Sequence, residues 1–287
     1  MESIISSLPT STKPLFMGIV NVTPDSFSDG GKYLKLEDAI KHAEELIKAG
    51  VNIIDVGGES TKPGAKLISE EEELKRIIPV IYELRKLYSK ITISVDTYKS
   101  NVAQLALSVG ANMINDVSGL TMDSEMAQVA AKSNCPIVIM HNNGIPATKP
   151  MLKNLTVIPA KAGIQKVGST RLDSHCHGND TSQLILKEVY NWLKKQTDFA
   201  LSNGIKKENI IVDPGIGFGK TAEEDFLLIQ NLEEFKSLDF PILVGPSRKS
   251  FIKKFFEDCS IEEKTKEMID IAIKNGANIV RLHKVYK

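Results

Sequence analysis

The chain alternates short apolar runs with segments that have the apolar spacing of a helix, and eight such runs occur along its 287 residues. Short β-branched runs are typical of strands buried on both faces, and strands that alternate with helices indicate a parallel sheet. Eight of them predict an α/β fold, the closed TIM (β/α)8 barrel, with an open doubly wound sheet as the alternative. The strands are expected at residues 15–20, 51–56, 91–95, 113–114, 136–140, 210–212, 241–244 and 278–280.

Helices are predicted between these strands, and glycine ends several of them. Gly50, Gly110, Gly204 and Gly276 each follow a segment with helical spacing, as is common just past a helix C-terminus. The second helix should begin near Ser69, because the four acidic residues after it suit the positive end of a helix dipole. The helices are expected at residues 36–49, 69–88, up to 109, 124–133, 184–201, 222–235 and 251–274, with a break in the last one.

Two segments depart from this regular pattern. Residues Leu155 to Ser182 lie between the fifth strand and the fifth helix and have little periodicity. Because so long an irregular segment is unusual in a compact domain, we expect an exposed, disordered insert at 155–182. The sequence reaches Lys287 soon after the eighth strand, so the final helix is expected to be missing or truncated. We therefore predict a single barrel domain over residues 1–287.

Composition excludes several classes of function. The formal net charge is zero, which argues against a protein that binds nucleic acid. No apolar run approaches the roughly 20 residues of a membrane span, and the N-terminus does not resemble a secretory signal. The three cysteines are far apart and odd in number, so they predict no disulfide framework and favour the cytoplasm. Cys176 lies between two histidines, but no second Cys/His pair completes a metal site.

Polar residues follow the predicted strands, although a barrel does not need them in order to fold. In a TIM barrel the active site lies at the carboxyl ends of the strands, so these residues are candidates for it. They are Asn21, Asp55, Asp96, Asn115, His141, Asp213, Lys249, Arg281 and His283.

Asp213 has the most distinctive surroundings of this set. It follows the buried run 210–212 and precedes a loop that contains Gly215, Gly217 and Gly219. The spacing fits neither a Walker loop nor a dinucleotide fingerprint, because Pro214 and Lys220 stand where glycine is required. We expect the glycines to let the backbone approach a flat ligand closely.

The types of these side chains suggest two ligand groups. Asp96, Asn115 and Asp213 offer acceptors and donors for an amino-heterocycle, since a carboxylate can accept two N–H groups from it. Lys249 could contact the ring, or it could instead form a buried ion pair with Asp213. Arg281 and His283 lie two residues apart on one strand and so share a face. With Asn21, Thr61 and Lys62 they suit a diphosphate, on which Asn21 could help to hold Mg²⁺.

These residues lie in blocks of sequence that resemble the dihydropteroate synthase family of the folate pathway. The resemblance implies a TIM barrel that condenses (7,8-dihydropterin-6-yl)methyl diphosphate with 4-aminobenzoate and uses Mg²⁺. It also implies a homodimer, and it implies that sulfonamides compete with 4-aminobenzoate. Lys62 departs from the family, which usually has arginine there. The blocks are residues 18–31, 57–61, 94–99, 114–116, 140–141, 213–221 and 247–250, and Arg281 with His283.

The resemblance also implies a role for each candidate residue. The pterin would be held by Asp96, Asn115, Asp213 and Lys249, of which Lys249, Asp96 and Asp213 would also be catalytic. The diphosphate and Mg²⁺ would be held by Asn21, Thr61, Arg281 and His283, and the 4-aminobenzoate pocket would be shaped by Phe27, Pro63 and Ser247. Two alternatives remain: a pterin-binding methyltransferase domain that works with a corrinoid protein, and a degenerate barrel that binds pterin without turnover.

Overall fold

Eight parallel strands form one sheet in the computed structural model, which describes residues 13–23, 36–61, 64–144, 179–247, 252 and 260–286. The order is β6-β5-β4-β3-β2-β1-β8-β7. A parallel bridge from Val212 to Ile242 joins the two ends of this sheet, so the barrel closes and the open-sheet alternative is wrong. The strands are β1 (Leu15–Asn21), β2 (Ile53–Gly57), β3 (Thr92–Asp96), β4 (Met113–Asp116), β5 (Ile137–Met140), β6 (Ile210–Asp213), β7 (Leu243–Val244) and β8 (Ile279–Leu282).

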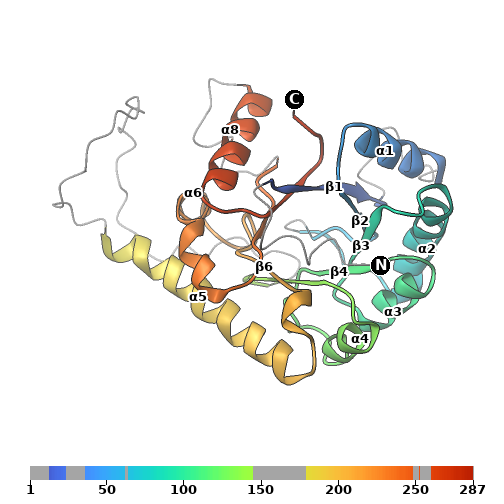
Figure 1. The fold of residues 1–287 in the computed structure, drawn as a ribbon, viewed down its shortest axis with the longest axis horizontal. Coiled ribbons are helices and arrows are strands. Elements are labelled where there is room, and N and C mark those ends of the chain that lie inside the picture. Colours follow the sequence, from blue (N-terminus) through green and yellow to red (C-terminus); the bar gives the residue numbers. More distant parts are fainter. Residues whose placement is uncertain are drawn as a thin grey trace.

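Helices surround the strands, as Figure 1 shows. Two large apolar clusters fill the space between these helices and the sheet. The α-helices are α1 (Leu36–Lys48), α2 (Glu70–Leu87), α3 (Ser100–Ser108), α4 (Met126–Ser133), α5 (Asn179–Ser202), α6 (Ala222–Gln230) and α8 (Ile261–Lys274), and short 3-10 helices lie at η2 (Lys207–Asn209) and η3 (Leu232–Leu238). None of the helices in these described ranges is both long and apolar enough to cross a membrane.

The predicted helix ends are largely confirmed. Gly50 and Gly276 have φ of 99° and 111°, a left-handed conformation that glycine adopts without strain. Ser69 caps α2, because its hydroxyl accepts the backbone N–H of Glu72 at 3.2 Å. Such a cap satisfies a donor that the first helical turn leaves without a partner.

Two helix boundaries differ from the prediction by five residues each. The expected helix at 222–235 ends at Gln230, and η3 continues the chain instead. Helix α5 begins at Asn179, inside the predicted insert. The prediction missed this start because it relied on apolar periodicity, which the polar run Asn179–Ser182 lacks, although such residues suit a helix start. The rest of the insert, 155–178, lies outside the described residues.

The interior of the barrel is packed with apolar side chains from several strands. This layer closes the barrel below its carboxyl end, as is usual for the fold. It consists of Met17, Ile53, Met113, Val138, Ile211, Leu243 and Ile279. A site for a small molecule is therefore expected above it, where the strands end in polar residues.

Candidate active site

Arg281 on β8 joins two carboxylates from neighbouring strands at the barrel mouth. Its Nε donates to Asp55 Oδ2 at 2.7 Å, and its Nη2 donates to Asp96 Oδ2 at 2.6 Å. The Asn115 side-chain amide donates to the same Asp55 oxygen at 3.0 Å. Parallel register brings these groups together, since Met17 of β1 pairs with Arg281 and Gly57 of β2 pairs with Asp96.

Burial shapes the electrostatics of this cluster. It raises the pKa of Asp96 to about 7, against the lowering effect of the Arg281 guanidinium and with a further rise from Asp55. Burial acts to lower the pKa of Arg281, but Asp55 and Asp96 outweigh it and hold that pKa above its ordinary value. The cluster thus keeps a fixed positive charge beside a carboxyl group that titrates near neutral pH.

Asp213 ends β6 and holds the start of the glycine loop. Its Oδ1 accepts the backbone N–H of Gly215 at 2.7 Å. Gly215 has φ of 71°, and a Cβ there would lie 1.7 Å from the carbonyl oxygen of His141. The close approach that this glycine permits within the protein is to the end of β5.

Lys220 holds the same loop from inside. Its buried ammonium donates to the carbonyl of Gly215 at 2.7 Å and reaches the His141 carbonyl at 3.4 Å. These contacts tie the loop after β6 to the end of β5, so Asp213 lies on a fixed support.

One pocket at the carboxyl end brings together five of the predicted site residues. It measures about 50 Å³, well below the several hundred Å³ of most small-molecule sites. Arg281 is both a wall of this pocket and the partner of Asp96, so a ligand that contacts Asp96 competes with Arg281. The five residues are Asn115, Asp213, Ser247, Arg281 and His283, and apolar residues including Ile19, Ile216 and Phe218 complete the lining.

His283 and Ser247 form a pair in this pocket. The His283 Nδ1 lies 3.2 Å from the Ser247 hydroxyl, which also accepts the His283 backbone N–H at 3.4 Å. The family resemblance assigned His283 to the diphosphate and Ser247 to the 4-aminobenzoate pocket, whereas the structure places the two side chains in contact.

The other candidates do not line this pocket or lie outside the described residues. Asn21 is the last residue of β1 and pairs with Gly57, and the half-buried Thr61 follows β2 by four residues. The predicted site residues for which no position is described are Phe27, Lys62, Pro63 and Lys249, so the suggested Asp213–Lys249 ion pair is not tested.

His141 belongs to the core. It is buried and meets the ring of Trp192 edge-on, with 5.1 Å between the ring centroids. Burial, with a contribution from Lys220, lowers its pKa to about 3, so the imidazole is neutral at physiological pH. Its place after β5 suggested a functional residue, but its ring packs against Trp192 of α5.

Asp55 is the residue whose importance the sequence understated. It lies at the middle of β2, fully buried, and holds both Asn115 and Arg281. The sequence feature that could have revealed this role is a carboxylate within an otherwise apolar strand, because a buried charge needs partners.

The donor set for Mg²⁺ is sparse in this part of the protein. Among the described residues, no group of three or more His, Cys, Asp or Glu could hold a metal ion. The Asn21 amide is a hard oxygen ligand at the mouth, and Mg²⁺ characteristically takes few protein ligands and completes its shell with waters and substrate phosphates. Asn21 therefore fits a Mg²⁺ that arrives with a diphosphate.

Comparison with known proteins identifies the family. Residues 17–283 match the model of the pterin binding enzymes. A dihydropteroate synthase of Synechocystis sp. is 44% identical over 94% of this chain and 84% of its own length. The chain belongs to the dihydropteroate synthase family. The relatives' names favour this family over the methyltransferase alternative.

Solved members of the dihydropteroate synthase family share the fold. One from Clostridium difficile, solved in the presence of pteroic acid, is 39% identical with a TM-score of 0.77 and covers 96% of this chain and 92% of its own. One from Xanthomonas albilineans, solved with 4-aminobenzoic acid, is 34% identical with a TM-score of 0.78 and covers 95% and 88%.

Proposed function

We propose that this chain is a transferase that condenses (7,8-dihydropterin-6-yl)methyl diphosphate with 4-aminobenzoate to give 7,8-dihydropteroate and diphosphate. The observation that carries the proposal is the pocket in which Asn115 and Asp213 face Arg281 and His283. Acceptors for a heterocycle thus lie beside the Arg281 guanidinium and the His283 imidazole, which can contact a leaving group. The ligands named for the two solved relatives, pteroic acid and 4-aminobenzoic acid, are a product-like molecule and a substrate of this reaction.

Asp96, Asn115 and Asp213 are the proposed pterin contacts. Asn115 donates its amide N–H to Asp55, so its amide oxygen is turned away from Asp55 and can accept an N–H from the ring. Asp213 is held in place by Gly215, and a carboxylate so fixed orients the amino group and ring N–H that it accepts. When the pterin contacts Asp96, the guanidinium of Arg281 gives up that carboxylate and turns to the diphosphate.

The same charges suit the chemical step. As the bond from the pterin methylene carbon to the diphosphate oxygen breaks, Arg281 and His283 stabilise the negative charge on the leaving group. The carboxylates Asp55 and Asp213 stabilise the positive charge that develops on the pterin, since fixed charges in a buried site need no reorganisation. The amine nitrogen of 4-aminobenzoate then forms a bond to the methylene carbon, and its proton passes to the released diphosphate or to water.

Mg²⁺, held by Asn21 and the diphosphate, would add positive charge to the leaving group. The roles of Lys249 in catalysis and of Phe27, Pro63 and Ser247 in the 4-aminobenzoate pocket remain proposals based on the family. A cytoplasmic location and a homodimer are proposed on the same basis.

A turnover assay with both substrates and Mg²⁺ tests the function. We expect dihydropteroate to form only when both substrates are present and a sulfonamide to inhibit competitively against 4-aminobenzoate. Calorimetric binding of a pterin without any product formation would instead support the degenerate, non-catalytic barrel.

A further inference from the structure

Both ends of the loop between β2 and α2 meet at the side chain of Lys99. The loop leaves the barrel at Gly58 and Glu59 and reaches Ile68 just before the helix cap. The Lys99 ammonium donates to Glu59 Oε2 at 2.5 Å and to the Ile68 carbonyl at 3.0 Å. The Ile68 N–H in turn lies 3.4 Å from Glu59 Oε2. One ammonium and one carboxylate therefore join the two ends, and we call this contact the loop clip.

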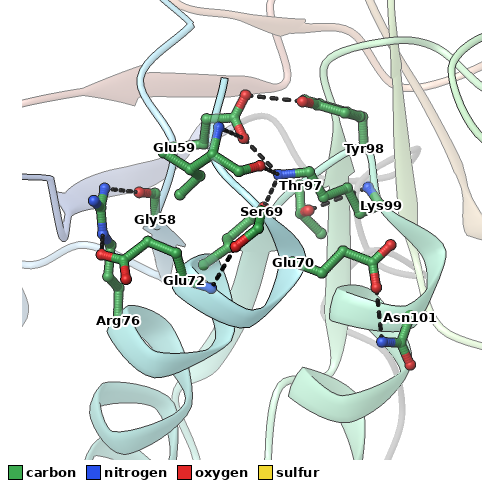
Figure 2. Close-up of polar contacts among 12 residues, drawn as sticks. Gly58, Glu59, Ser69, Glu70, Glu72, Arg76, Thr97, Tyr98, Lys99 and Asn101 are labelled. Atoms are coloured by element: carbon green, nitrogen blue, oxygen red, sulfur yellow. Dashed lines mark hydrogen bonds and ion pairs between the residues drawn. The ribbon is translucent and has the colours of Figure 1, made fainter. Parts of the chain in front are cut away.

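Neighbouring elements hold the loop clip from two sides. Tyr98 donates its hydroxyl to Glu59 Oε1 at 2.8 Å, so Tyr98 and Lys99 converge on one carboxylate, as Figure 2 shows. Lys99 also donates to Glu73 Oε2 of α2 at 2.6 Å. On the other side, Arg76 of α2 donates to the Gly58 carbonyl at 2.9 Å. The exits of β2 and β3 and the first turns of α2 are thereby fixed relative to one another.

The loop clip is buried, and two acidic side chains contact its one ammonium. The side chains of Glu59 and Glu73 are 4% and 1% exposed and that of Lys99 is 12% exposed, so two carboxylates share one ammonium. Buried ion pairs of this kind are weak contributors to stability, because desolvation offsets their attraction, and apolar replacements are often as stable. Their best-attested effect is to specify one arrangement among several, and here that arrangement joins the two described ends of the loop, residues 58–61 and 64–69.

We propose that Glu59 and Lys99 are positioning residues that fix Thr61, two residues beyond Glu59, at the mouth of the barrel for contact with the substrate's diphosphate. The diphosphate contact rests on the proposed function. The joined ends of the loop do not, because the hydrogen bonds that hold them together are present without any ligand. Neither Glu59 nor Lys99 lines the pocket, so they act through the loop.

The matched variants are Glu59→Gln and Glu73→Gln. Both replace a carboxyl group that contacts Lys99 with an amide of the same size, but only Glu59 belongs to the loop. Lys99→Met removes the donor to both ends of the loop and serves as a second variant. Lys75→Met, which breaks the exposed Lys75–Glu71 pair of α2, controls for the loss of any lysine–glutamate contact.

Hydrogen exchange on the ligand-free protein gives the first measurement. We expect amide exchange in the peptide that contains Thr61 to be at least about tenfold faster in Glu59→Gln and Lys99→Met, and within twofold of the parent in Glu73→Gln and Lys75→Met. Unchanged exchange in both Glu59→Gln and Lys99→Met would overturn the proposal, whether or not the protein has turnover.

Calorimetry with two ligands gives the second measurement. In Glu59→Gln, the Kd of the pterin diphosphate should rise at least about fivefold, and the Kd of a pterin that lacks phosphates should stay within twofold. In a Thr61→Val background the Glu59 substitution should add little, as expected of two residues that act through one contact. Equal weakening of both ligands would show a general structural effect and overturn the proposal. A parent protein with altered exchange in the clip variants but no turnover would refute only the proposed function.

Discussion

At the scale of single residues, two carboxylates at the mouth of the barrel, Asp55 and Asp96, contact the one guanidinium of Arg281. Asp96 has the clearest consequence, because burial raises its pKa to about 7 while Arg281 opposes the rise. A group with this pKa is about one-tenth ionised at pH 6 and about nine-tenths ionised at pH 8. The proton on Asp96 therefore decides whether the carboxyl group can accept two N–H groups from a ligand.

We predict that a pterin without phosphates binds roughly tenfold more tightly at pH 8 than at pH 6. The reason is that the apparent affinity scales with the ionised, binding-competent fraction of Asp96. Calorimetry at several pH values measures this, and a ligand without phosphates adds no phosphate titration of its own. Asp96→Asn should bind weakly at every pH. A parent affinity that does not change between pH 6 and 8 would count against Asp96 as a pterin contact.

We predict that Asp213→Asn weakens pterin binding by at least about thirtyfold, or about 2 kcal/mol. The side-chain oxygen of asparagine would still accept the Gly215 N–H, as Asp213 Oδ1 does at 2.7 Å. Its amide nitrogen would then face the donors of the ligand, where a second acceptor is needed. Calorimetry measures the change, and circular dichroism checks that the fold is retained. An affinity within threefold of the parent would remove Asp213 from the site.

Much of the site could be predicted from sequence, because the ends of parallel strands in a barrel must converge. Asn115, Asp213, Arg281 and His283 reach one pocket for this reason. The partners of these residues could not be predicted. Whether Arg281 faces a ligand or the carboxylate of Asp55 depends on strand register and on the reach of a long side chain, and spacing within one strand specifies neither.

At the scale of elements, glycines in the left-handed region serve two different purposes. Gly204 follows α5 with φ of 87°, and the one described atom within 4 Å of a Cβ there would be the Cβ of Ala131, at 3.9 Å. Gly215 has φ of 71°, but its Cβ would overlap the His141 carbonyl. The first position needs glycine for its conformation alone, and the second needs it for space as well.

We predict that Gly204→Ala costs about 1 kcal/mol of unfolding free energy, and that Gly215→Ala costs on the order of 4 kcal/mol or prevents folding. Urea denaturation of both variants measures the difference. The Gly215 variant should also lose pterin affinity, because the loop that fixes Asp213 has to move. Equal costs for the two variants would mean that the loop after β6 relaxes easily.

Local signals in the sequence predicted the elements well where a cap or a stop is encoded by one residue. Ser69 and Gly276 are examples, since each acts through its own side chain or its lack of one. The end of α6 was missed because apolar residues continue past Gln230: Leu232 and Phe235 are buried from η3 instead. A 3-10 helix can bury such residues without α-helical periodicity, and tertiary packing decides which form is adopted.

At the scale of the whole molecule, the count of strands sufficed to predict a barrel but gave no measure of how firmly it closes. Among the described residues, one bridge joins the two ends of the sheet, Val212 to Ile242, with the Val212 N–H donating to the Pro241 carbonyl at 2.9 Å. The buried titratable groups also act on the fold as a whole, since each changes how many protons the folded chain holds.

The buried acids and the buried His141 have opposite effects on how the stability of the fold changes with pH. Burial raises the pKa of Asp96 to about 7 and that of Asp116 to about 6, and it also raises the pKa of Glu73. The folded protein therefore keeps protons that the unfolded chain has released, and these acids stabilise the fold less as pH rises toward their folded values. His141 acts in the opposite sense, because its pKa falls to about 3, and the cost of keeping it neutral disappears as pH rises past about 6.5.

We predict that the unfolding free energy falls between pH 5 and pH 7, because these acids outnumber His141, which acts in the opposite sense. Each unmatched proton contributes about 1.4 kcal/mol per pH unit. Urea denaturation of the ligand-free protein at pH 5, 6 and 7 measures the slope. His141→Phe, which keeps an aromatic ring against Trp192, should make the fall steeper because it removes the opposing group. Asp116→Asn should make it shallower. A stability that rises from pH 5 to pH 7 would mean that Asp96 and Asp116 are ionised throughout this range, with Arg281 and the backbone N–H groups of Ser118 and Leu120 prevailing over burial.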